Sequence, residues 1–410
     1  MAGNISKRTI VGLDIGTSKV CAIIGEIKDD KIDIIGHGLS ESKGLKKGAI
    51  VNIELTVNSI KEAIKEAEVM SGIKIDSVIA GIAGSHIQGF NSHGVIAVKS
   101  GEITQSDIER VIDAARAVAI PADRQILHII PQEFIVDGQD GIKYPVGMSA
   151  VRLETKVHII TGSVASIQNI SKACQKAGIE VRDVVLEQLA CAEAVLNEDE
   201  KELGVALVDI GAGTTNIAVF QKNTIIHTGI IPIAGDLITN DIAVGLRTPI
   251  ESAEQIKITH GCAMKSLVDD EEVIKVPGIG GRPSQEIPKT LLCEIIEPRV
   301  EELFMLVKRE IFKSGIFDSL ASGIVLTGGS VSMDGIVELA ETVFEMPVRR
   351  GFPKGVGGLT DLVNGPEYST GVGLLLFGAK NIPRYSSFKS SSFGLNNVFG
   401  KLKDWFKDFF

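Results

Sequence analysis

Two short segments of this chain combine an aspartate with glycines and hydroxyl side chains in the same order. An apolar run ends at Asp209 and is followed by small residues from Gly211 to Thr215, and residues 11–24 repeat the pattern around Asp14. Glycines let a backbone approach a ligand closely, and hydroxyls and free amides can hydrogen-bond phosphate oxygens. An aspartate at such a turn commonly faces a metal ion, directly or through water. Both segments therefore predict phosphate-binding turns, although either alone would also fit an ordinary glycine hairpin.

The elements that must position these residues are strands. Each segment has the pattern of an apolar strand, a tight turn and a second apolar strand. The two copies lie about half of the 410 residues apart. Two such hairpins at this distance indicate two related halves with a nucleotide between them. Strand patterns alternate with helical patterns along the chain, so we expect the α/β fold class.

Composition restricts the class of protein. The net charge of −10 and the pI near 5.4 argue against a general nucleic-acid binder. The 5 cysteines are scattered without a Cys-x-x-Cys pair, which predicts reduced thiols in a cytosolic protein. No signal peptide and no membrane-spanning run of about 18 apolar residues is expected. His128 and His158 lie in apolar runs and are expected to be structural.

Three further features outside the hairpins bear on a nucleotide site. Thr327 leads into Gly328, Gly329 and Ser330, a strand ending in a glycine turn, and Gly235 with Asp236 forms another such turn. Backbone amides at these turns would suit a phosphate or an adenosine. Glu254 and Lys257 share one face of a predicted helix. This pair fits either an exposed ion pair, worth about 0–1 kcal/mol, or a contact to ribose and base.

Other segments indicate how the chain is organised. The block at about residues 85–162 reads as a small α/β unit inserted into the first half, with Thr104 as the N-cap of its helix. The charged stretch 197–202 is predicted to be a loop between the halves. Residues 269–288 are predicted to be an exposed loop with few strands. Residues 381–394 are polar and read as a flexible linker.

The last sixteen residues form an amphipathic pattern. Apolar side chains recur at helical spacing, and charged side chains fall on the opposite face. The apolar residues are Leu395, Val398, Phe399, Leu402, Trp405, Phe406, Phe409 and Phe410. One interpretation is a helix docked on the protein core. The other is a helix that lies in a membrane surface, where apolar burial would dominate because the segment carries little net charge. Several subunits assembled together would bind such a surface more tightly through avidity.

The motifs, in this order, resemble the actin-like ATPase superfamily over about residues 8–380. The matching segments are Asp14–Lys19, Glu187–Leu196, Asp209–Asn216, Leu326–Ser330 and Tyr368–Leu374. Within it the chain is identified as a member of the FtsA family of bacterial cell-division proteins. That identification rests on three features: the segment Gly235–Leu246 followed by Ala253–Lys257, the insert after Gly84, and the amphipathic end after a linker.

The resemblance implies an ATP site with Mg²⁺. Asp14 and Asp209 would hold Mg²⁺ through water, and Glu187 would position an attacking water. Gln188 stands where many relatives have proline, so the geometry around Glu187 is open. The implied nucleotide contacts are Gly16, Thr17, Ser18, Lys19, Gly211, Gly213, Thr214, Thr215, Asn216, Gly235, Asp236, Glu254, Lys257, Gly328, Gly329 and Ser330.

The resemblance also implies a division of the chain. The first half would comprise residues 1–84, 163–197 and 366–380, with the insert at 85–162; the second half would comprise 198–232 and 301–365, with a small subdomain at 233–300; a linker at 381–394 and a membrane-targeting helix at 395–410 would follow. The implied function is an ATP-binding scaffold that forms filaments, has at most slow ATPase activity and anchors the ring of the tubulin-like protein FtsZ to the cytoplasmic face of the cell membrane at the septum.

The implied partners are the FtsZ C-terminal peptide at the small subdomain, other copies of the chain, membrane lipid, and later division proteins at the insert. Nucleic acid is not expected. Two alternatives share the nucleotide fold: an actin-like ATPase of pilus assembly, and a sugar-kinase-type phosphotransferase. For a kinase the sequence offers no candidate catalytic base or sugar pocket. The amphipathic end favours the division protein over both.

Overall fold

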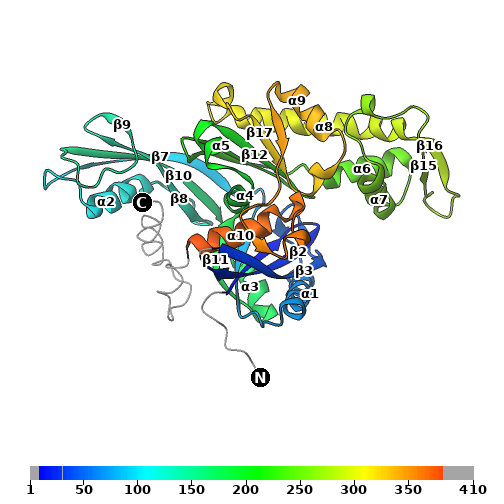
Figure 1. Cartoon of the computed structure of the whole chain (residues 1–410), viewed down its shortest axis with the longest axis horizontal. Coiled ribbons are helices and arrows are strands. Elements are labelled where there is room, and N and C mark those ends of the chain that lie inside the picture. The colour runs from blue at the N-terminus through cyan, green and yellow to red at the C-terminus, as the bar shows by residue number, and fades with distance from the viewer. Residues whose placement is uncertain (1–8, 30, 382–410) are drawn as a thin grey trace.

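Two central sheets with the same strand order form the middle of the structure (Figure 1). The computed structural model describes residues 9–29 and 31–381. The first sheet has the order β11 (Glu180–Leu186), β6 (Ser77–Ile82), β1 (Thr9–Ile15), β2 (Lys19–Lys28), β3 (Lys31–Glu41) and β19 (Gly357–Gly358). The second has the order β14 (Thr224–Ile231), β13 (Thr215–Gln221), β12 (Val205–Ile210), β17 (Ile324–Thr327) and β18 (Val348–Arg350).

Read from β18 to β14, the second sheet has the same order as β11 to β3 of the first, which carries β19 as an additional edge strand, and the pairing pattern is also shared. β1, β2 and β3 are successive antiparallel partners, and so are β12, β13 and β14. β6 and β11 extend the first sheet in parallel, as β17 and β18 extend the second. Parallel neighbours need a crossover connection, and helices supply it here. The α/β class predicted from the sequence is confirmed.

The first sheet is covered by helices on both faces. Alternate residues of β1 point to opposite sides, so Val11, Leu13 and Ile15 join one buried cluster and Ile10 joins another. The first cluster packs under α1 (Ile53–Ser71) and α3 (Val164–Ala177). The second packs under α4 (Glu187–Val195) and α10 (Ser369–Lys380), and also contains Val205 and Leu207 of the second sheet. α4 and α10 therefore lie between the two halves.

The second sheet packs against α8 (Lys289–Phe312) and α9 (Ile336–Phe344). A smaller unit extends from it, containing α6 (Gly235–Leu246), α7 (Ile250–His260), β15 (Val273–Val276) and β16 (Gln285–Pro288). The expectation of a strand-poor loop at 269–288 is wrong at 273–276 and 285–288, where β15 and β16 pair as a hairpin, and is confirmed at 277–284, which form the exposed loop between them. Ile274 and Val276 are buried in alternation with exposed neighbours, which gives this hairpin an apolar face.

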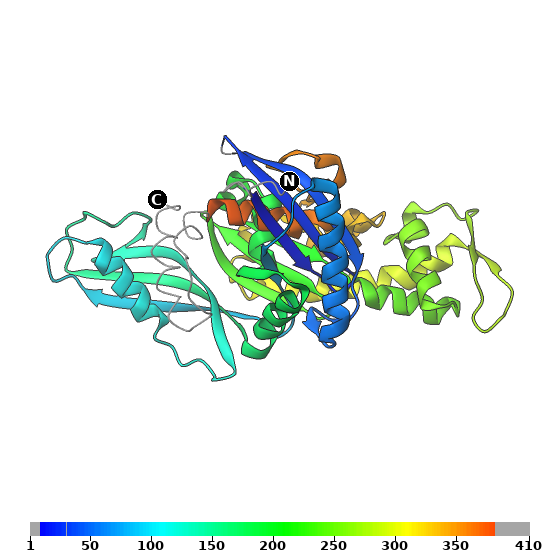
Figure 2. The ribbon, with the colours of Figure 1, turned by 90° about the horizontal axis from the view of Figure 1, so that it is seen from below.

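A four-stranded sheet forms the inserted unit. Its order is β7 (Gln88–Ala97), β10 (Arg152–Ser163), β8 (Arg124–Val136) and β9 (Gln139–Ile142), and α2 (Gln105–Arg116) packs on it. Thr104 caps α2 as predicted, in a capping box with Asp107. Figure 2 shows the inserted unit at one end of the molecule and the unit with α6 and α7 at the other.

The chain crosses between the halves at a short helix, α5 (Glu198–Leu203), where a loop was expected. The prediction failed because Asn197 and Glu200 form a capping box that satisfies the amides of this charged turn. Arg349 of β18 donates two hydrogen bonds to Glu200 and one, at 3.0 Å, to the carbonyl of Val195. These contacts fasten the crossing segment to the edge of the second sheet.

The remaining described elements are short. They are β4 (Leu45–Lys46), β5 (Ala49–Ile50), and the 3₁₀ helices Lys265–Leu267, Phe317–Ser319, Gly329–Ser332, Thr360–Leu362 and Pro366–Tyr368. All five cysteines are free, as predicted, and all five are buried. Between residues 9 and 381, residue 30 aside, no helix has the length and apolar character needed to cross a membrane. The predicted linker, apart from Asn381, and the amphipathic segment 395–410 lie outside the described residues.

Candidate functional site

Three carboxyl groups converge where the two central sheets face each other. Asp14 and Asp209 lie near the ends of β1 and β12, in register with Cys21 and Asn216 across their hairpins. Glu187 is the first residue of α4, which lies between the sheets. All three carboxylates are at most 9% exposed.

Burial perturbs the acidity of all three groups. It raises the pKa of Asp14 to about 6, with the nearby charge of Asp209 adding to the effect and Lys19 opposing it. Burial likewise raises the pKa of Asp209 to about 6. The pKa of Glu187 lies well above its ordinary value because of burial and then the charges of Asp14 and Asp209. Mutual influence of this kind places the three carboxyls in one electrostatic site.

Asn216 joins two of these groups. Its Nδ2 lies 3.4 Å from Glu187 Oε2 and 3.4 Å from Asp209 Oδ2. The neighbouring Gln188, at the position where the resemblance left the geometry open, points its amide toward the carbonyl of Gly229 on β14 at 3.4 Å. The side chain of Gln188 is therefore held by the second half, while that of Glu187 faces the site.

The two predicted turns have the same backbone geometry. The amide of Gly16 donates to Lys19 at 2.9 Å, and the amide of Gly211 donates to Thr214 at 3.0 Å. The turns also meet: a Cβ added to Gly213 would lie 2.7 Å from Thr17 Oγ1. Only glycine fits at Gly213 without displacing the other hairpin.

The other two glycine turns join the second hairpin. Gly211 accepts hydrogen bonds from the amide of Gly235 at 3.1 Å and from Ser330 Oγ at 2.8 Å. Gly328 has φ +92°, and a Cβ there would lie 2.3 Å from Asp209 Oδ1. The structure therefore brings together all four glycine turns that the sequence singled out.

The Glu254–Lys257 pair is more than an exposed ion pair. The two side chains are 2.7 Å apart, and Lys257 Nζ also donates to Thr239 Oγ1 at 2.8 Å and to the carbonyl of Gly235 at 3.3 Å. The Lys257 side chain is only 10% exposed. The pair is thus connected through Gly235 to the second hairpin, because the Gly235 amide donates to Gly211.

Some predicted contacts are engaged elsewhere. The hydroxyl of Thr215 donates to the carbonyl of Ile233 at 2.7 Å, so its side chain holds the loop before α6. Ser18 is exposed at the first turn. Sequence reasoning missed the β4–β5 hairpin, whose Gly48 amide donates to Thr17 Oγ1 at 3.1 Å. The Lys47-Gly48 pair, with positive φ at both residues, is the local signal for that turn.

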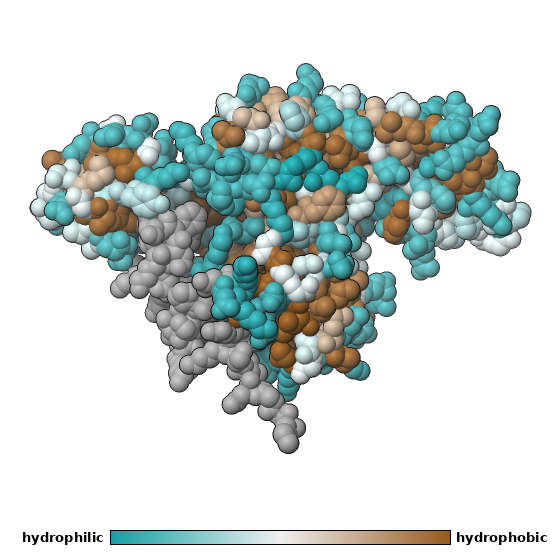
Figure 3. All heavy atoms as spheres, in the orientation of Figure 1, coloured by the Kyte–Doolittle hydropathy of each residue, from teal (hydrophilic) through white to brown (hydrophobic). Residues whose placement is uncertain are grey.

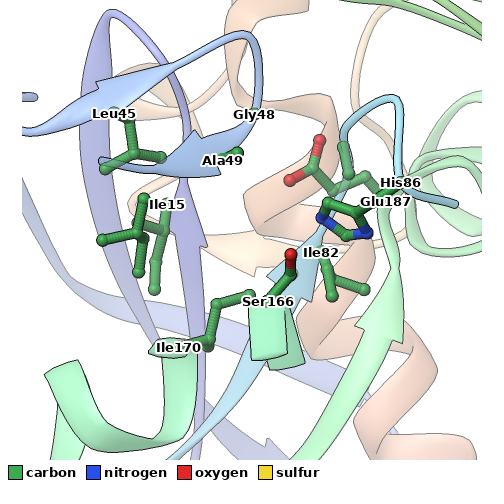
Figure 4. Close-up of a pocket in the computed structure, with 12 residues that line it drawn as sticks. Ile15, Leu45, Gly48, Ala49, Ile82, His86, Ser166, Ile170 and Glu187 are labelled. Carbon is green, nitrogen blue, oxygen red and sulfur yellow. The ribbon is translucent and has the colours of Figure 1, made fainter. Parts of the chain in front are cut away.

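A narrow pocket adjoins Glu187 (Figure 4). It is lined by apolar side chains from β1, β4, β5, β6 and α3, and by His86, Ser166 and Glu187. The water-accessible space is about 10 Å³, which is room for about one water molecule. Burial lowers the pKa of His86, whose Nδ1 has no hydrogen-bond partner among the described residues. The described residues contain no group of three His, Cys, Asp or Glu side chains arranged to hold a metal.

Comparison with known proteins decides the family. The family model for "Cell division protein FtsA" matches residues 206–373, and that for the "SHS2 domain inserted in FTSA" matches residues 84–161. FtsA of Pseudomonas aeruginosa is 55% identical over 379 residues, which cover 92% of this chain and 91% of that protein. The chain belongs to the FtsA family. FtsA of Escherichia coli K12 is 43% identical, covering 92% of this chain and 91% of that one.

Solved structures show the same fold at low identity. A chain of the PilM–PilN type IV pilus biogenesis complex aligns with TM-score 0.66 at 16% identity, covering 90% of this FtsA-family chain and 98% of that one. An MreB protein of Spiroplasma citri bound to ADP aligns with TM-score 0.56 at 14% identity, covering 93% and 100%. The actin-like fold expected from the sequence is confirmed. The high identity to FtsA proteins favours cell division over the pilus-assembly alternative.

Proposed function

We propose that this FtsA-family chain binds ATP with Mg²⁺ in the cleft between its two halves. The observation that carries the proposal is the convergence of Asp14, Asp209 and Glu187 with two glycine hairpins that touch at Gly213. Proteins of the same fold have been solved with ADP and with AMPPNP.

The residues present fit a hydrated magnesium ion. Asp14 and Asp209, with pKa values of about 6, are mostly ionised at pH 7 and would hold Mg²⁺ through water. The ion would supply positive charge to the phosphates. The amides and hydroxyls of the two hairpins would bind phosphate oxygens, Glu254 and Lys257 the ribose, and the turn from Gly328 to Ser330 the base.

Glu187 is placed to orient an attacking water. Its carboxyl faces the site, and Asn216 Nδ2 lies 3.4 Å from its Oε2 and helps to fix its position. We infer at most slow hydrolysis, as expected for a nucleotide that sets how the two halves close.

Equilibrium binding of ATP with and without Mg²⁺ tests the site. Asp209→Asn should weaken Mg²⁺-dependent binding at least about tenfold, the effect of losing a charge contact of about 1.4 kcal/mol. Asp318→Asn removes an exposed aspartate and is the matched control. Equal affinities of all three proteins would refute the cleft as the site. Single-turnover hydrolysis by Glu187→Ala then tests whether Glu187 positions the attacking water. An unchanged rate of hydrolysis would refute that role.

We further propose that the chain forms filaments and tethers an FtsZ ring to the cytoplasmic face of the membrane at the septum, through residues 395–410. The amphipathic pattern of those residues supports the tether, and the division-protein family supports the setting. Sedimentation with liposomes compares the full chain with one truncated after Arg384. Equal sedimentation of both proteins would refute the tether.

The small unit at about 233–300 is the proposed FtsZ contact. A groove of about 360 Å³ lies beside α7 and β15, lined by Ser252, Gln255, Thr259 and Lys275 among others. Exposed apolar side chains such as Ile258 lie on the same unit, and Figure 3 shows apolar residues among polar ones at that end. An extended peptide end would fit such a groove.

Blocking the groove tests the contact. Thr259 and Thr342 are both exposed, and each donates its hydroxyl to the carbonyl four residues earlier on its helix. Thr259→Trp should weaken binding of the FtsZ C-terminal peptide, and Thr342→Trp should not. Equal affinity of the two variants would argue against the groove. Later division proteins are proposed to bind the insert at 85–162, which lies at the opposite end of the molecule.

A further inference from the structure

Lys19 carries an ammonium group that is buried without a hydrogen bond. The residue begins β2, directly after the first phosphate turn. Its Nζ has no hydrogen-bond partner among the described residues, although its charge acts on Asp14 and Asp209. A buried cation without an acceptor is costly unless another group stabilises it.

The face of an aromatic ring supplies that stabilisation. Lys19 Nζ lies 4.0 Å from the centroid of the Tyr368 ring, within the range of a cation–π contact. Such a contact strengthens when the cation is removed from water. Unlike a carboxylate, a ring attracts the ammonium without accepting short hydrogen bonds, so N–H donors that do not face the ring remain available.

The segment that carries the ring is held by the second half of the chain. Tyr368 ends the 3₁₀ helix Pro366–Tyr368 and precedes α10. The carbonyl of Pro366 accepts hydrogen bonds from the Gly328 amide at 3.2 Å and from Thr327 Oγ1 at 3.3 Å. Thr327 also shares a 2.7 Å hydrogen bond with Ser369. The ring over the phosphate turn is thus anchored to the glycine turn of the second half.

We propose that Tyr368 is a positioning residue that keeps the Lys19 ammonium beside the first hairpin, unpaired, so that its donors can bind the phosphoryl oxygens of a nucleotide. Without the ring, nothing would hold the ammonium beside the hairpin, and it would turn toward solvent. The phosphate would then lose a cation that is already in place before it binds. The role toward phosphate rests on the proposed function; the placement of Lys19 by the ring does not.

Amine labelling tests the placement without nucleotide. Acetylation of Lys19 by a small acylating reagent is followed by peptide mass spectrometry in the wild type, Tyr368→Phe and Tyr368→Leu. Phe keeps the ring face, so Lys19 should stay protected, and Leu removes it, so labelling should rise several-fold. Equal labelling of the three proteins overturns the placement. Circular dichroism verifies folding, and Tyr368→Gln replaces the Leu variant if that protein does not fold.

Binding of ATP, ADP and adenosine tests whether Tyr368 supports the binding of phosphate by Lys19. Tyr368→Leu should weaken ATP and ADP about 2- to 30-fold, the range of one cation–π contact, and leave adenosine unchanged. Tyr368→Phe should match the wild type. Equal losses for all three ligands, or a Phe variant as weak as Leu, would overturn the role toward phosphate. A wild type that binds no ATP would refute the proposed function, while the labelling result would still decide the placement.

Discussion

His158 gives the sharpest prediction because it lies at the junction between the insert and the second half. It is 1% exposed on β10. Its Nδ1 is 2.7 Å from Asn91 Oδ1 within the insert, and its Nε2 is 2.9 Å from Thr228 Oγ1 on β14. Burial, and then the charge of His227, lowers its pKa from 6.5 to about 4.

The lowered pKa of His158 determines both the direction and the size of the change in stability with pH. The folded protein holds His158 neutral, whereas the unfolded chain binds a proton below about pH 6.5. The contribution of neutral His158 to the free energy of unfolding is therefore fully present above pH 6.5 and is lost as the pH falls toward 4. At about 1.4 kcal/mol per unit, the loss at pH 5 is about 2 kcal/mol.

Urea unfolding at pH 7.5 and pH 5, followed by circular dichroism, measures this loss. Replacement His158→Gln removes the titrating group, so the difference between wild type and variant should change by about 2 kcal/mol between the two pH values. Other titrating groups are common to both proteins and cancel. His260→Gln, at a partly exposed histidine, is the control. An unchanged difference, or an NMR titration of His158 near pH 6.5, would refute the reasoning.

Three other predictions address the cleft and the crossing segment. Affinity for ATP with Mg²⁺ should fall at least about tenfold from pH 8 to pH 5 by calorimetry, because Asp14 and Asp209 become protonated below about pH 6; a flat profile would contradict this. Gly213→Val should abolish ATP binding, since its side chain would displace the first hairpin, while circular dichroism stays unchanged. Arg349→Ala should lower the unfolding free energy by about 1–2 kcal/mol in urea, because the Glu200 carboxylate loses its partner, and a smaller change in Glu200→Gln would support that cause.

The sequence predicted what depends on neighbours along the chain. The hairpins at Asp14 and Asp209 were identifiable because strand, turn and strand are contiguous, and α2 because its N-cap signal is local. The contact of Asn216 with Glu187 could not be identified from the sequence, because it joins residues 29 positions apart that meet only where α4 approaches β13. The β15–β16 hairpin was missed because only two residues of β15, Ile274 and Val276, are buried.

The junction at His158 and the cleft are joined by one pair of strands. β13 carries Asn216, which faces Glu187 and Asp209, and it pairs in register with β14, which carries Thr228. The insert is continuous with the first half through β6 and α3, yet it contacts the second half at β14. Any closure that moves the halves must therefore either carry the insert along or break the hydrogen bond to His158.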